Sequence, residues 1–185
     1  IDIGGGIGVT YNNEKTIDIE EYIQSVVRKV GNLKVMVEPG RSIVGNAGIF
    51  VTKVEYLKQN DSKSFAIIDG AMNDLLRPAL YGSYHQAVKV IDNAKGINAL
   101  WDLVGPVCET ADFLAKDRNL NLEEGDYIAI MTAGAYGFVL SSNYNSRPRT
   151  AEVMVSENSH AIVRKRETIE SLFVNETIFK DETNQ

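Results

Sequence analysis

The sequence predicts a short α/β segment followed by an antiparallel β domain. Two observations support this division. Up to about residue 42, a helical apolar period lies between two short apolar runs, which is the order strand, helix, strand of a parallel β/α unit. From about residue 46, short apolar runs follow one another with turns between them, and some alternate with period two. This second pattern is typical of an antiparallel sandwich or a Greek-key barrel.

The α/β segment begins with Ile1–Ile3, which we expect to be the end of a buried strand, followed by a glycine turn. Asp18 is expected to cap a helix, with Glu21 three residues later as in a capping box. Apolar residues of that helix recur at spacings of three and four: Ile19, Tyr22, Ile23, Val26, Val27 and Val30. Gly31 is placed to end the helix, and Leu33–Val37 is predicted to be a second short strand.

The β domain is predicted from apolar runs that are short and separated by turns. The predicted strands are Ile49–Leu57, Phe65–Asp69, Ala87–Ile91, Ala99–Val104, Tyr127–Thr132, Ala151–Val155 and His160–Arg164, and Leu120–Asp126 is predicted to be a polar turn entering a strand. Pro78 disfavours a helix through Arg77, so an ordered loop is expected there. Arg166–Phe173 is predicted to be a short helix, and Glu176–Gln185 is poor in apolar residues and is expected to fray.

Composition excludes several classes of protein. The 185 residues carry 19 Lys and Arg against 25 Asp and Glu, a net charge of −6, which argues against a nucleic-acid partner. No apolar run reaches the ~18 residues of a membrane span. Cys108 is the single cysteine, so neither an internal disulfide nor a cysteine-based zinc site is expected. His85 and His160 lie far apart without acidic partners at ligand spacing, so no metal site is predicted.

The first residues, IDIGGGIG, contain no initiator Met and no targeting segment. A chain that begins inside a core strand would leave an unpaired strand edge. We therefore expect the sequence to be the C-terminal piece of a longer chain. The alternative is a short edge strand at a naturally processed terminus.

Two turns in the α/β segment carry candidate binding residues. Residues 4–8 (GGGIG) follow a predicted strand, and their backbone N–H groups could cradle a phosphate; the alternative is a tight structural turn. Residues 38–41 (EPGR) end the next predicted strand. Glu38 could accept a hydrogen bond from a cationic ring nitrogen, and Arg41 could bind a carboxylate or phosphate. A turn with a surface ion pair is the alternative.

Three further segments in the β domain carry candidate residues. Arg77 and Tyr81 could jointly hold a carboxylate, and the apolar residues around them indicate a loop that packs against something, such as another subunit. Cys108 beside Glu109 could act as a general acid, although a lone cysteine is more often a small buried apolar residue. Tyr136 lies among small residues that permit close approach of a ligand; a packed aromatic side chain at a bend is the alternative.

Together these segments resemble the C-terminal part of the diaminopimelate decarboxylase family. The matching stretches are IDIGGGIG, VEPGRSIV, DGAMNDLLRPALYGSYH, GPVCETAD, TAGAYGF and SNYNSRPRTAEVMV, in this order from residue 1 to about residue 155. Enzymes of this family use pyridoxal 5′-phosphate and combine a (β/α)8 barrel with a β domain. The resemblance implies that residues 1–42 are the last strands of that barrel. It implies that residues 43–185 form a Greek-key antiparallel β domain with a returning helical segment.

The resemblance also implies a role for each candidate residue. The residues implied to bind the cofactor are Gly4, Gly5, Gly6 and Gly40 at the phosphate, Glu38 at the protonated pyridine nitrogen, and Tyr136 near the phosphate. The residues implied to clamp the distal substrate carboxylate are Arg41, Arg77 and Tyr81. Glu109 would recognise the distal ammonium, and Cys108 would return a proton after CO₂ leaves. Both would act in the active site of the neighbouring subunit of a homodimer.

The implied reaction converts meso-2,6-diaminopimelate to L-lysine and CO₂, the last step of lysine biosynthesis, in a cytoplasmic enzyme. The family's lysine that binds the cofactor covalently lies upstream of residue 1, so the 185 residues by themselves are expected to be inactive. Two alternatives stay open. One is an ornithine- or arginine-type polyamine decarboxylase of the same group. The other is a non-catalytic β-domain module for binding or assembly.

Overall fold

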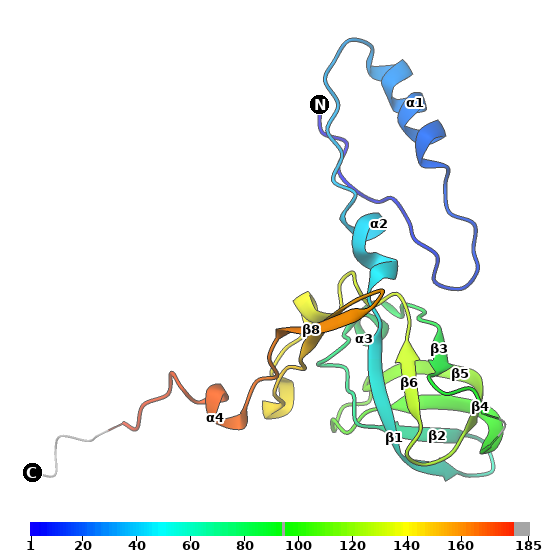
Figure 1. The fold of residues 1–185 in the computed structure, drawn as a ribbon, viewed down its shortest axis with the longest axis vertical. Coiled ribbons are helices and arrows are strands. Elements are labelled where there is room, and N and C mark those ends of the chain that lie inside the picture. The colour runs from blue at the N-terminus through cyan, green and yellow to red at the C-terminus, as the bar shows by residue number, and fades with distance from the viewer. Residues whose placement is uncertain (94, 180–185) are drawn as a thin grey trace, which may run out of the picture. The chain divides into compact units, whose positions relative to one another are not determined.

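A computed structural model describes residues 1–93 and 95–179 (Figure 1). The chain divides into two compact units, with the boundary between Ser141 and Ser142. Residues 180–185, the end of the segment expected to fray, lie outside the described part. The boundary between residues 42 and 43 that the family resemblance implies stays a prediction.

The first unit contains a six-stranded sheet with the spatial order β3-β6-β1-β2-β4-β5. Its strands are β1 (Phe50–Gln59), β2 (Ser64–Ile68), β3 (Ala87–Lys89), β4 (Ile97–Val104), β5 (Phe113–Leu122) and β6 (Tyr127–Ile130). Neighbouring strands are antiparallel except β2 and β4, which run parallel, with Phe65 opposite Asp102. The expectation of a wholly antiparallel domain is therefore wrong at this pair. The connection from β2 to β4 is long enough for the crossover that a parallel pair requires.

The two ends of the strand order meet, because β3 and β5 contact each other. The Lys89 ammonium donates to the Asn121 carbonyl oxygen on β5 at 3.3 Å and forms an ion pair with Asp126 at 2.8 Å. The side chains of Lys89 and Asp126 are only 8% and 10% exposed. The sheet is thus a nearly closed, barrel-like structure (Figure 1). The buried ion pair of Lys89 and Asp126 lies where its two outer strands meet.

The interior of this sheet is apolar. Its fully buried side chains include Val54, Ile68, Trp101, Leu103, Leu114, Leu122, Ile128 and Ile130. Strand β5 is absent from the predicted strands, and the predicted polar turn Leu120–Asp126 is wrong at Leu120–Leu122, which end β5. Residues 116–119 (KDRN) leave the apolar alternation because they lie on an outer strand, where Lys116 and Asp117 are exposed.

The N-terminal segment contains the predicted helix as α1 (Ile19–Val30), and none of its residues is buried. The Asp18 carboxylate accepts a hydrogen bond from the Glu21 N–H at 2.9 Å, as the cap prediction requires. The predicted strands Ile1–Ile3 and Leu33–Val37 are wrong as strands, since only one parallel bridge forms, between Asp2 and Met36. Two short segments paired only with each other are marginal in water.

Two short helices follow within this unit and carry site residues. The first, α2 (Gly40–Val44), continues into a 3₁₀ turn, η1 (Gly45–Ala47). The second, α3 (Arg77–Tyr81), replaces the ordered loop that was predicted there. Pro78 is tolerated because it occupies the first turn, where its missing N–H would have no helical partner. Gly82 then ends the helix in the left-handed conformation, with φ +61°.

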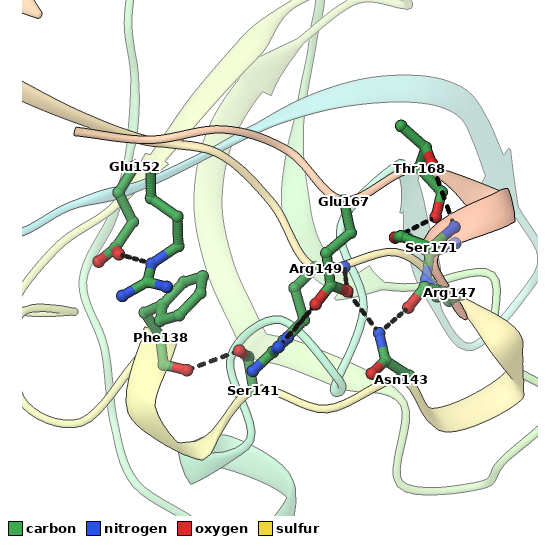
Figure 2. A network of polar contacts seen from close by, with 10 residues as sticks. Phe138, Ser141, Asn143, Arg147, Arg149, Glu152, Glu167, Thr168 and Ser171 are labelled. Atoms are coloured by element: carbon green, nitrogen blue, oxygen red, sulfur yellow. Dashed lines mark hydrogen bonds and ion pairs between the residues drawn. The ribbon is translucent and has the colours of Figure 1, made fainter. Parts of the chain in front are cut away.

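The second unit is a two-stranded hairpin of β7 (Glu152–Ser156) and β8 (Ser159–Arg164) with flanking short helices. The predicted helix Arg166–Phe173 is shorter in the structure, as α4 (Ile169–Leu172). Figure 2 shows its polar network, in which Arg149 Nη2 and Nε donate to Glu167 Oε1 at 2.6 and 2.8 Å. The bonds from Arg149, helped by Asn143, hold the pKa of Glu167 down to about 2. In the part of the chain that the structure describes, each helix is too short or too polar to cross a membrane.

Candidate functional site

The glycine loop after residue 3 is shaped by backbone conformations that favour glycine. Gly4 and Gly6 have φ values of +69° and +88°, and a Cβ on Gly5 would lie 2.5 Å from the Glu38 carbonyl oxygen. The Gly4 N–H donates to Asp2 Oδ1 at 2.8 Å. The N–H groups of Gly5 and Gly6 form no hydrogen bond within the described residues. These two exposed donors, in a loop whose backbone conformations favour glycine, fit a phosphate group.

The EPGR turn lies directly against this loop. The Glu38 N–H donates to the Gly4 carbonyl oxygen at 2.9 Å, and the Gly40 N–H donates to the Glu38 carbonyl oxygen at 3.0 Å. The Glu38 carboxylate is exposed. A Cβ on Gly40 would lie 3.8 Å from the Tyr136 hydroxyl, so this turn connects the glycine loop to Tyr136. Arg41 follows in α2, half-buried, and its guanidinium pairs with no carboxylate in the described part of the chain.

Arg77 is a buried cation, only 8% exposed. Its Nη2 donates to the Ser83 hydroxyl at 3.3 Å, and its buried Nε has no hydrogen-bond partner. The guanidinium lies 5.4 Å from the ring centre of Tyr81 and 6.0 Å from that of Tyr136. No carboxylate among the described residues pairs with it. Because burying an unpaired charge is costly, this position is suited to an anionic ligand.

Ser83 and His85 are neighbours of Arg77 that the sequence analysis missed. His85 is fully buried, and its Nδ1–H donates to the Met131 carbonyl oxygen at 2.9 Å. Burial lowers the pKa of His85, and the charges of Arg77 and Arg118 lower it further, although the bond to Met131 opposes them. The ring therefore stays neutral near neutral pH. The signal in the sequence was the polar segment GSYH directly after the Arg77 segment.

Cys108 and Glu109 lie on a different loop, residues 105–112, where both are exposed. The loop is tied to the chain that precedes α3, because the two Asp112 carboxylate oxygens accept hydrogen bonds from the N–H groups of Met72 and Val107, each at 2.6 Å. Contacts thus run from the glycine loop through the EPGR turn to Tyr136 and Arg77. The Cys108 loop reaches this series through Asp112. Asp112 ends the motif GPVCETAD, but the motif alone predicts no role for it.

The arrangement offers two kinds of anion site. Backbone donors at the glycine loop suit a phosphate-bearing cofactor, and Arg77 suits a carboxylate. Over residues 1–93 and 95–179, the His, Cys, Asp and Glu side chains form no group of three or more that could hold a metal ion.

Residues 10–134 match the family model described as the C-terminal sheet domain of pyridoxal-dependent decarboxylases. Curated relatives named diaminopimelate decarboxylase match nearly the whole chain. The one from Haemophilus influenzae is 49% identical over 180 residues, and the one from Pseudomonas aeruginosa is 51% identical over 182 residues. Each alignment covers 96% of this chain but only 43% of the relative. The solved Helicobacter pylori diaminopimelate decarboxylase complexed with L-lysine superposes with a TM-score of 0.85 at 44% identity, covering 93% of this chain and 43% of that one.

Proposed function

Because the chain belongs to the pyridoxal-dependent decarboxylase family, we propose that it is the C-terminal part of a diaminopimelate decarboxylase. The proposed reaction converts meso-2,6-diaminopimelate to L-lysine and CO₂, the last step of lysine biosynthesis, in the cytoplasm. The names of the relatives support this choice, and one of them is described with L-lysine bound. Since the chain spans 43% of the relatives' length, the activity belongs to the longer protein.

Arg77 is the observation that carries this proposal. The substrate has a carboxylate at each end, and only one of them is lost. The buried guanidinium, which lacks a protein carboxylate partner in the described part of the chain, would bind the carboxylate that is retained. The Tyr81 hydroxyl and the Arg41 guanidinium would complete that clamp. Binding at the distal end would place the opposite carboxylate at the reacting centre.

The glycine loop and the EPGR turn fit the phosphate and ring of pyridoxal 5′-phosphate. When bound, this cofactor supplies an electron sink for the electron pair released as CO₂ leaves. The N–H groups of Gly5 and Gly6, with backbone at Gly4 and Gly40, would hold the phosphate, and the Tyr136 hydroxyl would lie near it. The exposed Glu38 carboxylate would hold a proton at the pyridine nitrogen.

Cys108 and Glu109 are proposed to act across a homodimer. Cys108 Sγ would deliver a proton to the carbon that has lost CO₂, and the Glu109 carboxylate would bind the distal ammonium. Both side chains are exposed on their loop, which leaves them accessible to a partner subunit. In this proposal residues 1–42 complete a (β/α)8 barrel, and residues 43–185 form the Greek-key domain with its returning helical segment.

The test is an assay of the full-length protein that carries this chain, with pyridoxal 5′-phosphate added. We expect release of CO₂ and L-lysine from meso-diaminopimelate, and a strongly raised KM for Arg77→Lys because the bidentate fork is lost. Preference for ornithine or arginine would favour the polyamine alternative. Absence of decarboxylation with all three substrates would favour the non-catalytic alternative. The 185-residue chain assayed alone is expected to form no lysine.

A further inference from the structure

Asp112 has an unusually complete set of hydrogen bonds for a loop carboxylate. It is 5% exposed, and its Oδ1 and Oδ2 each accept one backbone N–H at 2.6 Å. Its own N–H donates to the Glu109 carbonyl oxygen at 3.0 Å, and its carbonyl oxygen accepts the Gly105 N–H at 3.1 Å. Asp112, at the end of the loop that carries Cys108, therefore bonds to the start of that loop at Gly105 and Val107 and to its middle at Glu109.

Gly105 admits this carboxylate at close range. A Cβ on Gly105 would lie 2.6 Å from Asp112 Oδ1 and 2.8 Å from the carboxyl carbon. These distances are well inside van der Waals contact, so any side chain at Gly105 would displace the carboxylate. The glycine and the aspartate thus form one unit at the base of the loop.

The second loop held by Asp112 leads into the helix that begins at Arg77. Met72, whose N–H is bound to Asp112, lies in a compact turn between Ala71 and Leu75. The Leu75 N–H donates to the Ala71 carbonyl oxygen at 3.3 Å, and the Ala71 N–H donates to Asp74 Oδ2 at 3.0 Å. Because the turn is internally bonded, fixing Met72 fixes the start of α3.

We propose that Asp112 is a positioning residue that holds the Cys108–Glu109 loop and the Arg77 helix in one fixed arrangement. The bridge rests on geometry within this chain. Its catalytic consequence rests on the proposed function, in which Arg77 binds the substrate carboxylate and Cys108 delivers a proton. In the proposed homodimer, Arg77 would serve its own subunit and Cys108 the neighbouring one, so Asp112 would connect two active sites.

Amide hydrogen exchange, followed by NMR on the 185-residue chain, tests the bridge directly. In Asp112→Asn the amide keeps one acceptor oxygen and loses the other, and Asp112→Ala loses both. We expect exchange at both Met72 and Val107 to accelerate about tenfold or more in Asp112→Ala, with a smaller effect in Asp112→Asn. The matched control is Asp61→Asn, at an exposed aspartate in the β1–β2 turn, which should change neither amide.

The outcomes separate a bridge from general destabilisation. In Asp112→Ala, exchange that accelerates at only one of the two amides, or at neither, would overturn the proposal. Trp101, fully buried in the sheet, reports whether the core stays folded. If Asp112→Ala unfolds the core by this measure, Asp112→Asn decides, and exchange that stays at the wild-type rate at both Met72 and Val107 would then overturn the proposal.

A second measurement uses the full-length decarboxylase. We expect Asp112→Asn to lower kcat and raise KM together, since both loops would loosen, whereas Arg77→Lys should act mainly on KM. A kcat effect without a KM effect would mean that Asp112 positions only the Cys108 loop and would overturn the bridge. If wild type forms no lysine, the proposed function fails, and hydrogen exchange alone decides whether Asp112 holds the two loops together.

Discussion

Replacing Arg77 by methionine should stabilise the chain while removing the guanidinium proposed to bind the substrate carboxylate. The native guanidinium is 8% exposed and lacks an anionic partner in the described part of the chain. A buried charge without an ionic partner lowers the free energy of unfolding by about 3–5 kcal/mol. The Ser83 hydrogen bond at 3.3 Å recovers about 1.5 kcal/mol, and the two tyrosine rings recover about 0.5–1 kcal/mol each. Methionine keeps most of the packing of the stem, which leaves a net gain of about 1 kcal/mol.

Urea unfolding followed by the fluorescence of Trp101 measures this difference, because Trp101 is fully buried in the same unit. Arg28→Met, at an exposed arginine in the last turn of α1, is the control and should change stability by less than about 0.5 kcal/mol. A loss of more than about 1 kcal/mol in Arg77→Met would refute the reasoning, since it would show that the guanidinium is already compensated within the protein.

Three further predictions concern the join of the sheet, the Cys108 loop and the hairpin unit. Lys89→Met should destabilise the first unit by about 3–5 kcal/mol in urea unfolding because it leaves the buried Asp126 carboxylate unpaired; an unchanged midpoint would contradict a buried pair. Gly105→Ala should displace the Asp112 carboxylate and speed amide exchange in the loop, and unaltered exchange rates would count against the close packing. Glu167 has a folded pKa of about 2 against an ordinary 4.5, so its pairing is fully present above about pH 4.5 and is lost as the pH falls toward 2. An NMR titration of its carboxyl carbon with a midpoint near 4.5 would show that the pairing does not form.

The elements that could be predicted are those whose signal is local. Period-two alternation in residues 50–55 predicts β1, and the Asp18 cap with its apolar face predicts α1. β5 was missed because its residues 116–119 are polar on an outer strand, and the parallel pairing of β2 with β4 depends on a crossover that no short window contains. α3 could not be predicted because proline disfavours a helix through the residue before it, although the first turn of a helix tolerates Pro78.

For the candidate site, the identity of the residues could be predicted from local motifs, whereas their arrangement in space could not. Motif residues such as Glu38 and Arg77 could be chosen from the sequence because their neighbours match a family pattern. The arrangement of these residues in space could not be predicted from the sequence, because the contact of Gly40 with Tyr136 joins segments almost a hundred residues apart. The hydrogen bond from Met72 to Asp112 is a contact of the same long-range kind, 40 residues apart.

The meeting of β3 with β5 also decides which strand edges remain open to other molecules. In the first unit the two outer strands face each other, so little unpaired backbone is offered for intermolecular strand addition. The two-stranded sheet of β7 and β8 has no further strand beside it in the described part of the chain, and its Met154, Val155 and Ile162 side chains are 62%, 73% and 66% exposed. Aggregation of the isolated chain should therefore begin at this hairpin rather than at the barrel-like sheet. A charged residue at Val155 is the substitution that would protect it.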